Sequence, residues 1–190
     1  MRKFNMIVAI DDNFCIGKDG HLLARIPEDM KFFKETTQNK VVIMGKNTQE
    51  SLPNGLYLKD RINIIISKKL TIDAGIYLYD DTIVYYASNI DEIYDFINEI
   101  NDAYASGDNI YNNLHINDED VFVIGGGQTY KYFLDNDLID KVYITHIYHS
   151  FEGDTYIPNI SDYGFKQSTT ISPVTKSETG YDFSIDIYKK

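Results

Sequence analysis

Short apolar runs alternate along this chain with segments of helical periodicity, and this alternation limits the possible folds more than any other feature. Continuous apolar runs of four to eight residues are typical of strands that are buried on both faces. Segments with this strand pattern, two of them interrupted by polar residues, lie at 6–10, 41–44, 61–67, 83–87, 121–124 and 142–147. Strands that alternate with helices indicate an α/β fold, with a mainly parallel sheet and helices on both of its faces.

The intervals between these runs predict the helices. They lie at 27–36, 48–52, 90–100 and 129–135. The first begins at Pro27, whose fixed φ suits the first helical position, and Glu28 and Asp29 place negative charge in its first turn. The last two segments of strand pattern, 165–172 and 181–188, are expected to pair antiparallel at an edge of the sheet, which brings the sheet to about eight strands.

The length of 190 residues corresponds to one domain, which we expect to cover 1–190. Residues 11–26 lack a strand or helix pattern and are predicted to form a loop. Residues 101–118 are polar and rich in Asn and Asp, and they are predicted to form a surface insertion. In such sheets ligands bind where the parallel strands end, so the residues after Ile10, Met44, Ser67, Ile124 and Ile147 are candidates for a site.

The composition excludes several classes of protein. The formal net charge is -11, whereas a general nucleic-acid binder or a polybasic membrane anchor is basic. No apolar run approaches the ~20 residues that span a bilayer, and the N-terminal apolar stretch is too short for a signal peptide. The single cysteine, Cys15, cannot form an intrachain disulfide. These features favour a cytoplasmic protein.

Asp29 and Phe33 form the first candidate for chemistry. They are separated by four residues on a predicted helix and therefore share a face. A carboxylate beside an aromatic ring suits a flat, nitrogen-rich heterocycle, which stacks on the ring while its N–H groups bond to the carboxylate. The alternative is that Asp29 merely stabilises the N-terminus of the helix through the helix dipole.

Two strand–glycine–helix junctions form the second candidate. Gly125-Gly126-Gly127 and Gly45-Lys46 each follow a predicted strand and precede a helix, an arrangement that can hold a phosphate on backbone N–H groups. Lys46 and Lys68, which follow different strands, could pair with phosphates. The alternatives are a tight turn at the glycines and ordinary solvated lysines.

Taken together, these segments resemble the dihydrofolate reductase family, in order and over nearly the whole chain. The matching segments are Ile16-Gly17, Ile26-Pro27-Glu28-Asp29-Met30-x-x-Phe33-Lys34-x-x-Thr37, Val42-Ile43-Met44-Gly45-Lys46-x-Thr48-x-Glu50-Ser51, Arg61-x-Asn63-Ile64-Ile65-Ile66-Ser67, Val123-Ile124-Gly125-Gly126-Gly127-x-x-Tyr130, Tyr143-Ile144-Thr145-His146-Ile147 and Glu152-Gly153-Asp154-Thr155-Tyr156-Ile157-Pro158. The resemblance implies a monofunctional, cytoplasmic and monomeric enzyme that reduces 7,8-dihydrofolate with NADPH and binds antifolate inhibitors. It also implies a cis peptide between the first two glycines and a mobile loop at 16–24.

The resemblance further implies roles for individual residues, with no metal ion. Catalysis is assigned to Asp29, Thr145, Tyr130 and Leu22. Substrate contacts are assigned to Ile7, Val8, Asp29, Met30, Phe33, Leu52, Leu58, Arg61, Ile124 and Thr145, with Arg61 on the glutamate carboxylate. NADPH contacts are assigned to Ala9, Ile16, Gly17, Gly45, Lys46, Asn47, Thr48, Ser67, Lys68, Ser88, Gly125, Gly126, Gly127, Gln128, Thr129 and Tyr130.

The chain departs from the family pattern at a few positions. Leu23-Ala24 stands where the family usually has Pro-Trp, Gln49 replaces another common tryptophan, and Phe32 stands where tryptophan or tyrosine is common. Two alternatives therefore stay open: a different NADPH reductase of the same fold, such as the pyrimidine reductase of riboflavin synthesis, and a folate- or NADPH-binding protein without turnover. Asp29, Phe33 and Arg61 argue against the first.

Overall fold

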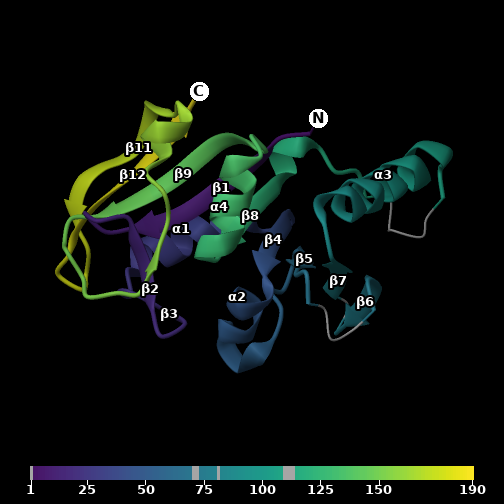
Figure 1. Ribbon diagram of the computed structural model, residues 1–190, viewed down its shortest axis with the longest axis horizontal. Helices are drawn as coiled ribbons and strands as arrows, with labels where there is room; N and C mark the ends of the chain where they lie inside the picture. Colours follow the sequence, from purple (N-terminus) through teal and green to yellow (C-terminus); the bar gives the residue numbers. More distant parts are fainter. Residues whose placement is uncertain (1, 70–72, 81, 109–113) are drawn as a thin grey trace.

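The computed structural model describes residues 2–69, 73–80, 82–108 and 114–190, and a nine-stranded sheet runs through the molecule (Figure 1). Its strands are β1 (Phe4–Ile10), β4 (Val41–Gly45), β5 (Ile62–Ile66), β6 (Gly75–Tyr79), β7 (Thr82–Ala87), β8 (Val121–Gly125), β9 (Ile139–Ile147), β11 (Lys166–Lys176) and β12 (Asp182–Lys189). The order across the sheet is β11-β12-β9-β1-β8-β4-β5-β7-β6. The first strand of the chain therefore lies near the middle.

Six neighbouring strands, from β9 across to β7, run parallel, which confirms the mainly parallel sheet. At one edge β12 pairs antiparallel with β9, and β11 pairs antiparallel with β12, as the tail of the sequence predicted. The other edge carries β6, which pairs antiparallel with β7 and was not predicted. Its side chains are largely exposed, so it lacks the continuous apolar run by which the central strands were found.

The prediction of a loop over 11–26 was wrong in part. A second sheet of three short strands forms there, from β2 (Cys15–Lys18), β3 (His21–Leu22) and β10 (Thr155–Tyr156). The turn between β2 and β3 is tight, because a Cβ at Gly17 would stand 2.7 Å from the carbonyl oxygen of His21. Strands of two to four residues are too short to show an apolar period, so they could not be predicted from the sequence.

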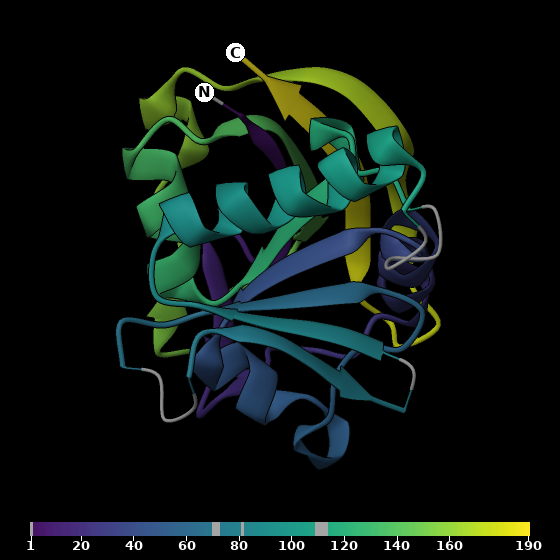
Figure 2. The ribbon, with the colours of Figure 1, turned by 90° about the vertical axis from the view of Figure 1, so that its right-hand side faces the viewer.

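In the part of the chain that the structure describes, four α-helices cover the two faces of the large sheet. They are α1 (Pro27–Thr37), α2 (Lys46–Ser51), α3 (Ile90–Ser106) and α4 (Gly127–Asp135). The buried faces of α3 and α4 pack with Phe4, Val41 and Ile43 in the main core. On the opposite face, Leu52, Tyr57 and Leu58 of the segment after α2 pack against the cluster that contains Val42 and Met44. Figure 2 shows α3 and α2 on opposite sides of the strands β4, β5 and β7.

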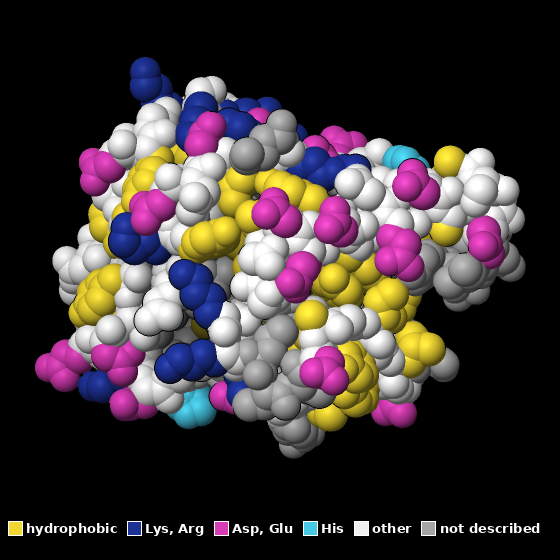
Figure 3. Space-filling view, turned by 45° about the vertical axis from the view of Figure 1, so that its right-hand side comes forward, with side chains coloured by type: hydrophobic (Ala, Val, Ile, Leu, Met, Phe, Trp, Pro, Cys, Tyr) yellow, Lys and Arg dark blue, Asp and Glu magenta, His cyan; other side chains and the backbone are white. Residues whose placement is uncertain are grey.

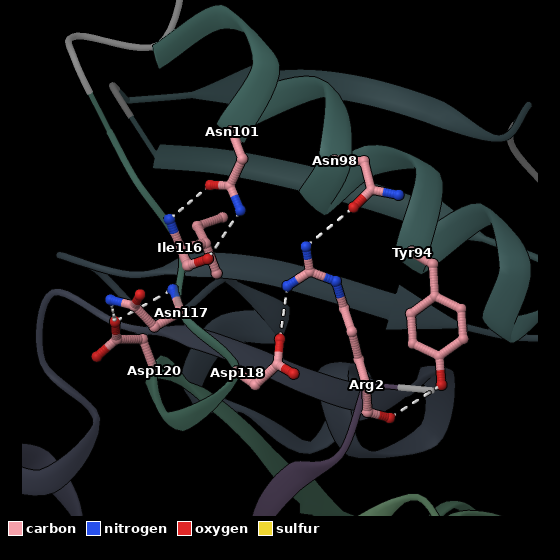
Figure 4. A network of polar contacts seen from close by, with 8 residues as sticks. All are labelled: Arg2, Tyr94, Asn98, Asn101, Ile116, Asn117, Asp118 and Asp120. Atoms are coloured by element: carbon pink, nitrogen blue, oxygen red, sulfur yellow. Dashed lines mark hydrogen bonds and ion pairs between the residues drawn. The ribbon is translucent and has the colours of Figure 1, made fainter. Parts of the chain in front are cut away.

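The predicted insertion at 101–118 also requires correction. Its first six residues continue α3, which ends at Ser106 with Gly107 in the left-handed conformation, and residues 109–113 lie outside the described part of the chain. Residues 114–118 lie against α3. The Asn101 side chain exchanges two hydrogen bonds with the backbone of Ile116, and Arg2 donates to both Asn98 and Asp118 (Figure 4). The C-terminal end of the segment is therefore hydrogen-bonded to α3 through Ile116 and to Arg2 through Asp118.

Acidic side chains are spread widely over the surface in Figure 3, in keeping with the net charge of -11. Hydrophobic side chains gather on the lower part of the same face (Figure 3). Ile76, Leu78 and Tyr79 of β6 are among the large hydrophobic side chains that are exposed. Within the described ranges, none of the helices is both long and apolar enough to cross a membrane.

Candidate functional site

The candidate site lies where the parallel strands end, as predicted. On neighbouring strands Ala9 of β1 pairs in register with Thr145 of β9, and the first turn of α1 stands over this pair. The Thr145 hydroxyl donates a 2.5 Å hydrogen bond to Oδ1 of Asp29. The structure therefore brings together two side chains that are 116 residues apart in the sequence.

Burial shapes the chemistry of the Asp29 carboxylate. Desolvation raises the pKa of Asp29 above its usual range, and the hydrogen bond from Thr145 opposes this only in part. The Tyr130 side chain is fully enclosed next to it, and its hydroxyl donates to the carbonyl oxygen of Ile7 at 2.7 Å. Burial and the negative charge of Asp29 raise the pKa of Tyr130, so this phenol stays protonated. The site thus holds one titratable carboxylate among groups that keep their charge state.

A small cavity of about 10 Å³ lies directly beside Asp29. Its lining consists of Ala9, Ile16, Leu22, Leu23, Ala24, Asp29 and Ile147. A volume of this size is at the lower limit for one water molecule. Leu22, Leu23 and Ala24 therefore lie beside the carboxylate, and the cavity that they line is far smaller than a bicyclic heterocycle.

The arginine that was predicted to bind a carboxylate, Arg61, directly precedes β5 and lies against α1. The Arg61 guanidinium lies 5.9 Å from the centre of the Phe33 ring. Its Nε donates to the Thr37 hydroxyl at 2.9 Å, and its two terminal nitrogens donate to the carbonyl oxygens of Lys59 and Lys34. These three hydrogen bonds fix the Arg61 side chain next to the Phe33 ring. Phe33 and Asp29 lie on the same face of α1.

A buried amide fixes the segment that leads to Arg61. Asn63 is fully buried, and its side chain accepts from the N–H of Leu58 and donates to the carbonyl oxygens of Leu58 and Arg61. Leu58 and Leu52 pack beside Ile124 on the same face of the sheet. Neither Asn63 nor Thr37 was assigned a role from the sequence, although both lie inside the segments that resemble the family.

The glycines at the end of β8 are needed for close packing. The peptide between Gly125 and Gly126 is cis, as the resemblance implied. A Cβ at Gly127 would stand 2.9 Å from the carbonyl oxygen of Tyr156, and one at Gly45 would stand 2.6 Å from the Thr129 hydroxyl. The N-terminus of α4 has no side-chain cap, so its first backbone N–H groups are available to an anion.

The basic residues predicted for phosphate binding come from two adjacent strands. β4 and β5 lie on the same side of β8, and Lys46 and Lys68 follow their ends. Lys46 is partly buried and lies 3.7 Å from the exposed Glu50, whereas Lys68 is exposed. Ser88 also follows a strand end, but its hydroxyl donates to Glu92.

The other predicted residues divide by exposure. Ile7 and Val8 are buried in β1, whereas Ala9, Ile16 and Ile124 are only partly buried on the strands that end here. Leu22, Met30, Asn47 and Gln128 are exposed, and Thr48 and Ser67 are partly buried. Leu23 and Ile147, which line the cavity, were not assigned a substrate or cofactor contact from the sequence. No cluster of metal-ligating side chains occurs in the described ranges.

Comparison with known proteins gives one consistent family. The sequence model described as "Dihydrofolate reductase" matches residues 3–190. The dihydrofolate reductase of Staphylococcus haemolyticus is 31% identical over 188 residues, which cover 99% of this chain and 96% of that protein. The Gallus gallus dihydrofolate reductase is 30% identical over 203 residues, covering 100% of this chain and 97% of that protein.

A solved structure agrees with the sequence matches. It is "Dihydrofolate reductase from Enterococcus faecalis complexed with NADP(H)and RAB-propyl", which superposes with a TM-score of 0.70 at 26% sequence identity. The match covers 98% of this chain and 95% of that one.

Proposed function

This chain belongs to the dihydrofolate reductase family, whose members catalyse the NADPH-dependent reduction of 7,8-dihydrofolate to 5,6,7,8-tetrahydrofolate, and we propose that Asp29 is its proton-handling residue. The observation that carries this proposal is the partly buried Asp29 carboxylate, held by Thr145 beside a cavity of water size. Its raised pKa suits a group that must take part in proton transfer near neutral pH.

Asp29 would act on the pterin from the first turn of α1. Its carboxylate accepts hydrogen bonds from the amino and ring N–H groups of the substrate, and its negative charge favours protonation of the imine nitrogen. The small cavity supports a route for that proton through one water molecule. Thr145 keeps the Asp29 carboxylate in its orientation, while Ile7 and Phe33 would pack against the flat pterin ring.

A movement of the segment 22–24 would make room for the substrate, because Leu22, Leu23 and Ala24 line the small cavity beside Asp29. Loops that close over a site exclude water from the reaction. Leu23 and Ala24, which replace the usual Pro-Trp, would form this cover with a smaller side chain at position 24. The glutamate tail would then lie along Leu52 and Leu58 and end at Arg61, whose planar guanidinium suits a carboxylate.

NADPH would supply the hydride. The residues present fit this cofactor, since the glycines at 125–127 allow close approach and the start of α4 offers uncapped N–H groups to its pyrophosphate. Lys46 and Lys68 would pair with the 2′-phosphate, and Ser67 would donate a further hydrogen bond. Ala9 and Ile16 line the cavity from the other side and would border the nicotinamide.

We also propose that residues 1–190 form one domain, which works as a monomer in the cytoplasm and binds antifolate inhibitors. Purified protein would be assayed for loss of NADPH absorbance with dihydrofolate, with the pyrimidine intermediate of riboflavin synthesis, and with neither. A diaminopteridine inhibitor should abolish the dihydrofolate-dependent rate. Tight NADPH binding without folate-dependent oxidation would instead favour a binding protein, and preference for the pyrimidine would favour the other reductase.

A further inference from the structure

The first turn of α1 carries a second acidic residue that reaches away from the site. The N-cap residue of this helix, Ile26, makes no side-chain cap hydrogen bond. The next carboxylate, that of Glu28, instead binds the connection between β11 and β12. Its Oε2 accepts from the Ser177 hydroxyl at 2.7 Å, and its Oε1 accepts from the backbone N–H of Glu178 at 3.0 Å.

In the hairpin formed by β11 and β12, Ser177 is a rigidly held partner for Glu28. Ser177 is only 4% exposed. Its N–H donates to the carbonyl oxygen of Tyr181 at 2.8 Å, and its own carbonyl oxygen accepts from Gly180 at 2.9 Å. The hydrogen bonds from Ser177 and Glu178 lower the pKa of Glu28, so the carboxylate is ionised at neutral pH. We call this two-point contact the Glu28 clasp.

Glu28 and Asp29 are adjacent in sequence, and the partners of Glu28 lie on the connection that leads into β12, the strand next to the one that holds the partner of Asp29. Asp29 binds Thr145 on β9, and β12, which follows the clasped hairpin, pairs in register with β9 through Ile185 and Thr145. Ile26 packs against Ile147 and other apolar side chains of this region. In both ribbon views the hairpin lies close to the start of α1 (Figures 1 and 2).

We propose that Glu28 is a positioning residue for the reductase reaction: its clasp on Ser177 and Glu178 fixes the first turn of α1, and with it the direction of the Asp29 carboxylate. This inference rests on the proposed role of Asp29. Glu28 itself touches neither substrate nor cofactor. Because misplacement of a reacting group by about 1 Å can cost on the order of 100-fold in rate, a partly released turn should slow the chemical step.

The test compares Glu28→Ala and Glu28→Gln with Glu35→Ala, a matched control on the same helix. Glu35 is exposed, and the nearest atom of its ion-pair partner Lys31 is 3.9 Å away. The measurement is the single-turnover rate of hydride transfer at saturating dihydrofolate and NADPH, together with the NADPH dissociation constant. Circular dichroism reports whether each variant is folded.

Glu28→Ala should slow hydride transfer about tenfold and leave NADPH affinity within about twofold, because the cofactor cradle lies on other elements. Glu28→Gln should keep most of the rate, since the amide oxygen still accepts from Glu178 and the amide group can donate to the Ser177 hydroxyl. Ser177→Ala should reproduce part of the loss, and adding it to Glu28→Ala should cost little more, as expected for two members of one contact.

Equal hydride-transfer rates for Glu28→Ala and Glu35→Ala would overturn the proposal. So would an equally large loss in Glu28→Gln, because it would assign the effect to charge and not to position. If Glu28→Ala does not fold, the rates of Glu28→Gln and Ser177→Ala decide by the same criteria. Asp29→Asn is measured alongside: an active Asp29→Asn would refute the role of Asp29 itself, whereas an inactive one with unaffected Glu28→Ala would refute only the clasp.

Discussion

Replacing Asp29 by Asn removes the charge of the central carboxylate and keeps its shape. The amide oxygen can still accept the hydrogen bond that the Thr145 hydroxyl now donates to Asp29 at 2.5 Å, so the geometry of the site should survive. Only the negative charge that favours the protonated pterin is lost. Because this charge lies in a partly buried site, solvent screens it poorly and little else nearby replaces it.

The expected loss in hydride-transfer rate at neutral pH is therefore ~100- to 10,000-fold, the usual range for general acid–base groups. This corresponds to about 3–5 kcal/mol in the activation barrier, at ~1.36 kcal/mol for each factor of ten. NADPH affinity should be unchanged, because the glycine turn at 125–127 does not involve Asp29. The rate of the variant should rise as pH falls, since solvent then protonates the substrate.

The assay is single-turnover oxidation of NADPH by saturating dihydrofolate, recorded across a range of pH for the parent, for Asp29→Asn and for Asp140→Asn. Asp140 is exposed near the start of β9, the strand that also carries Thr145, so its replacement removes the same charge far from the site. A rate for Asp29→Asn above about half of the parent rate at neutral pH would refute the proton-handling role. An equal loss in both variants would refute it as well.

Three further predictions follow from the same geometry. Arg61→Leu should raise the Michaelis constant for dihydrofolate about tenfold or more with less effect on NADPH, because hydrogen bonds to charged groups are worth ~1.5–3 kcal/mol; an unchanged constant would mean that other residues hold the tail. Replacing Lys46 and Lys68 together by Ala should weaken NADPH by roughly 1–3 kcal/mol and NADH much less, and titrations that show equal losses would contradict a role in reading the 2′-phosphate. Asp29→Asn should melt at a higher temperature than the parent at about pH 7 and at the same temperature near pH 4, the usual range for an unfolded Asp. The reason is that the pKa of Asp29 is raised in the folded state, so the parent loses stability as pH rises from the unfolded pKa through the folded one. If the difference in melting temperature between Asp29→Asn and the parent does not narrow on acidification, this reasoning is contradicted.

The central strands could be predicted because burial on both faces makes them continuous apolar runs. β4, for example, is buried at Val41–Met44 and was found with nearly its full length. β6 and the short strands β2, β3 and β10 could not be found in this way, because exposed or very short strands carry no such run. Residues 101–118 were assigned to a surface insertion because the segment is rich in Asn and Asp. In the structure α3 continues to Ser106, and Asn101 bonds to the backbone of Ile116, a tertiary contact that local composition does not reveal.

The candidate site could be predicted where one element carries the whole pattern, as α1 does with Asp29 and Phe33. Its partner Thr145 came only from the family resemblance, since nothing local relates a strand residue to a helix 116 residues away. The supporting residues Thr37, Asn63 and Glu28 were missed for a similar reason. Each acts through a hydrogen bond whose partner the sequence does not reveal, and a polar residue alone does not tell whether it will be buried and bonded.

The position of β1 between β8 and β9 has a consequence for folding during synthesis on the ribosome. Asn5 pairs with Phe122 on one side and with Lys141 on the other. The first strand to be synthesised therefore cannot pair until β8 and β9 have also been synthesised. At ~5–20 residues/s that wait is about 6–25 s. During it the apolar strand Phe4–Ile10 has both backbone edges unpaired, which favours slow folding and exposes the nascent chain to aggregation. The centre of this sheet is therefore completed late, and truncated chains that end before β8 should depend on chaperones to stay in solution.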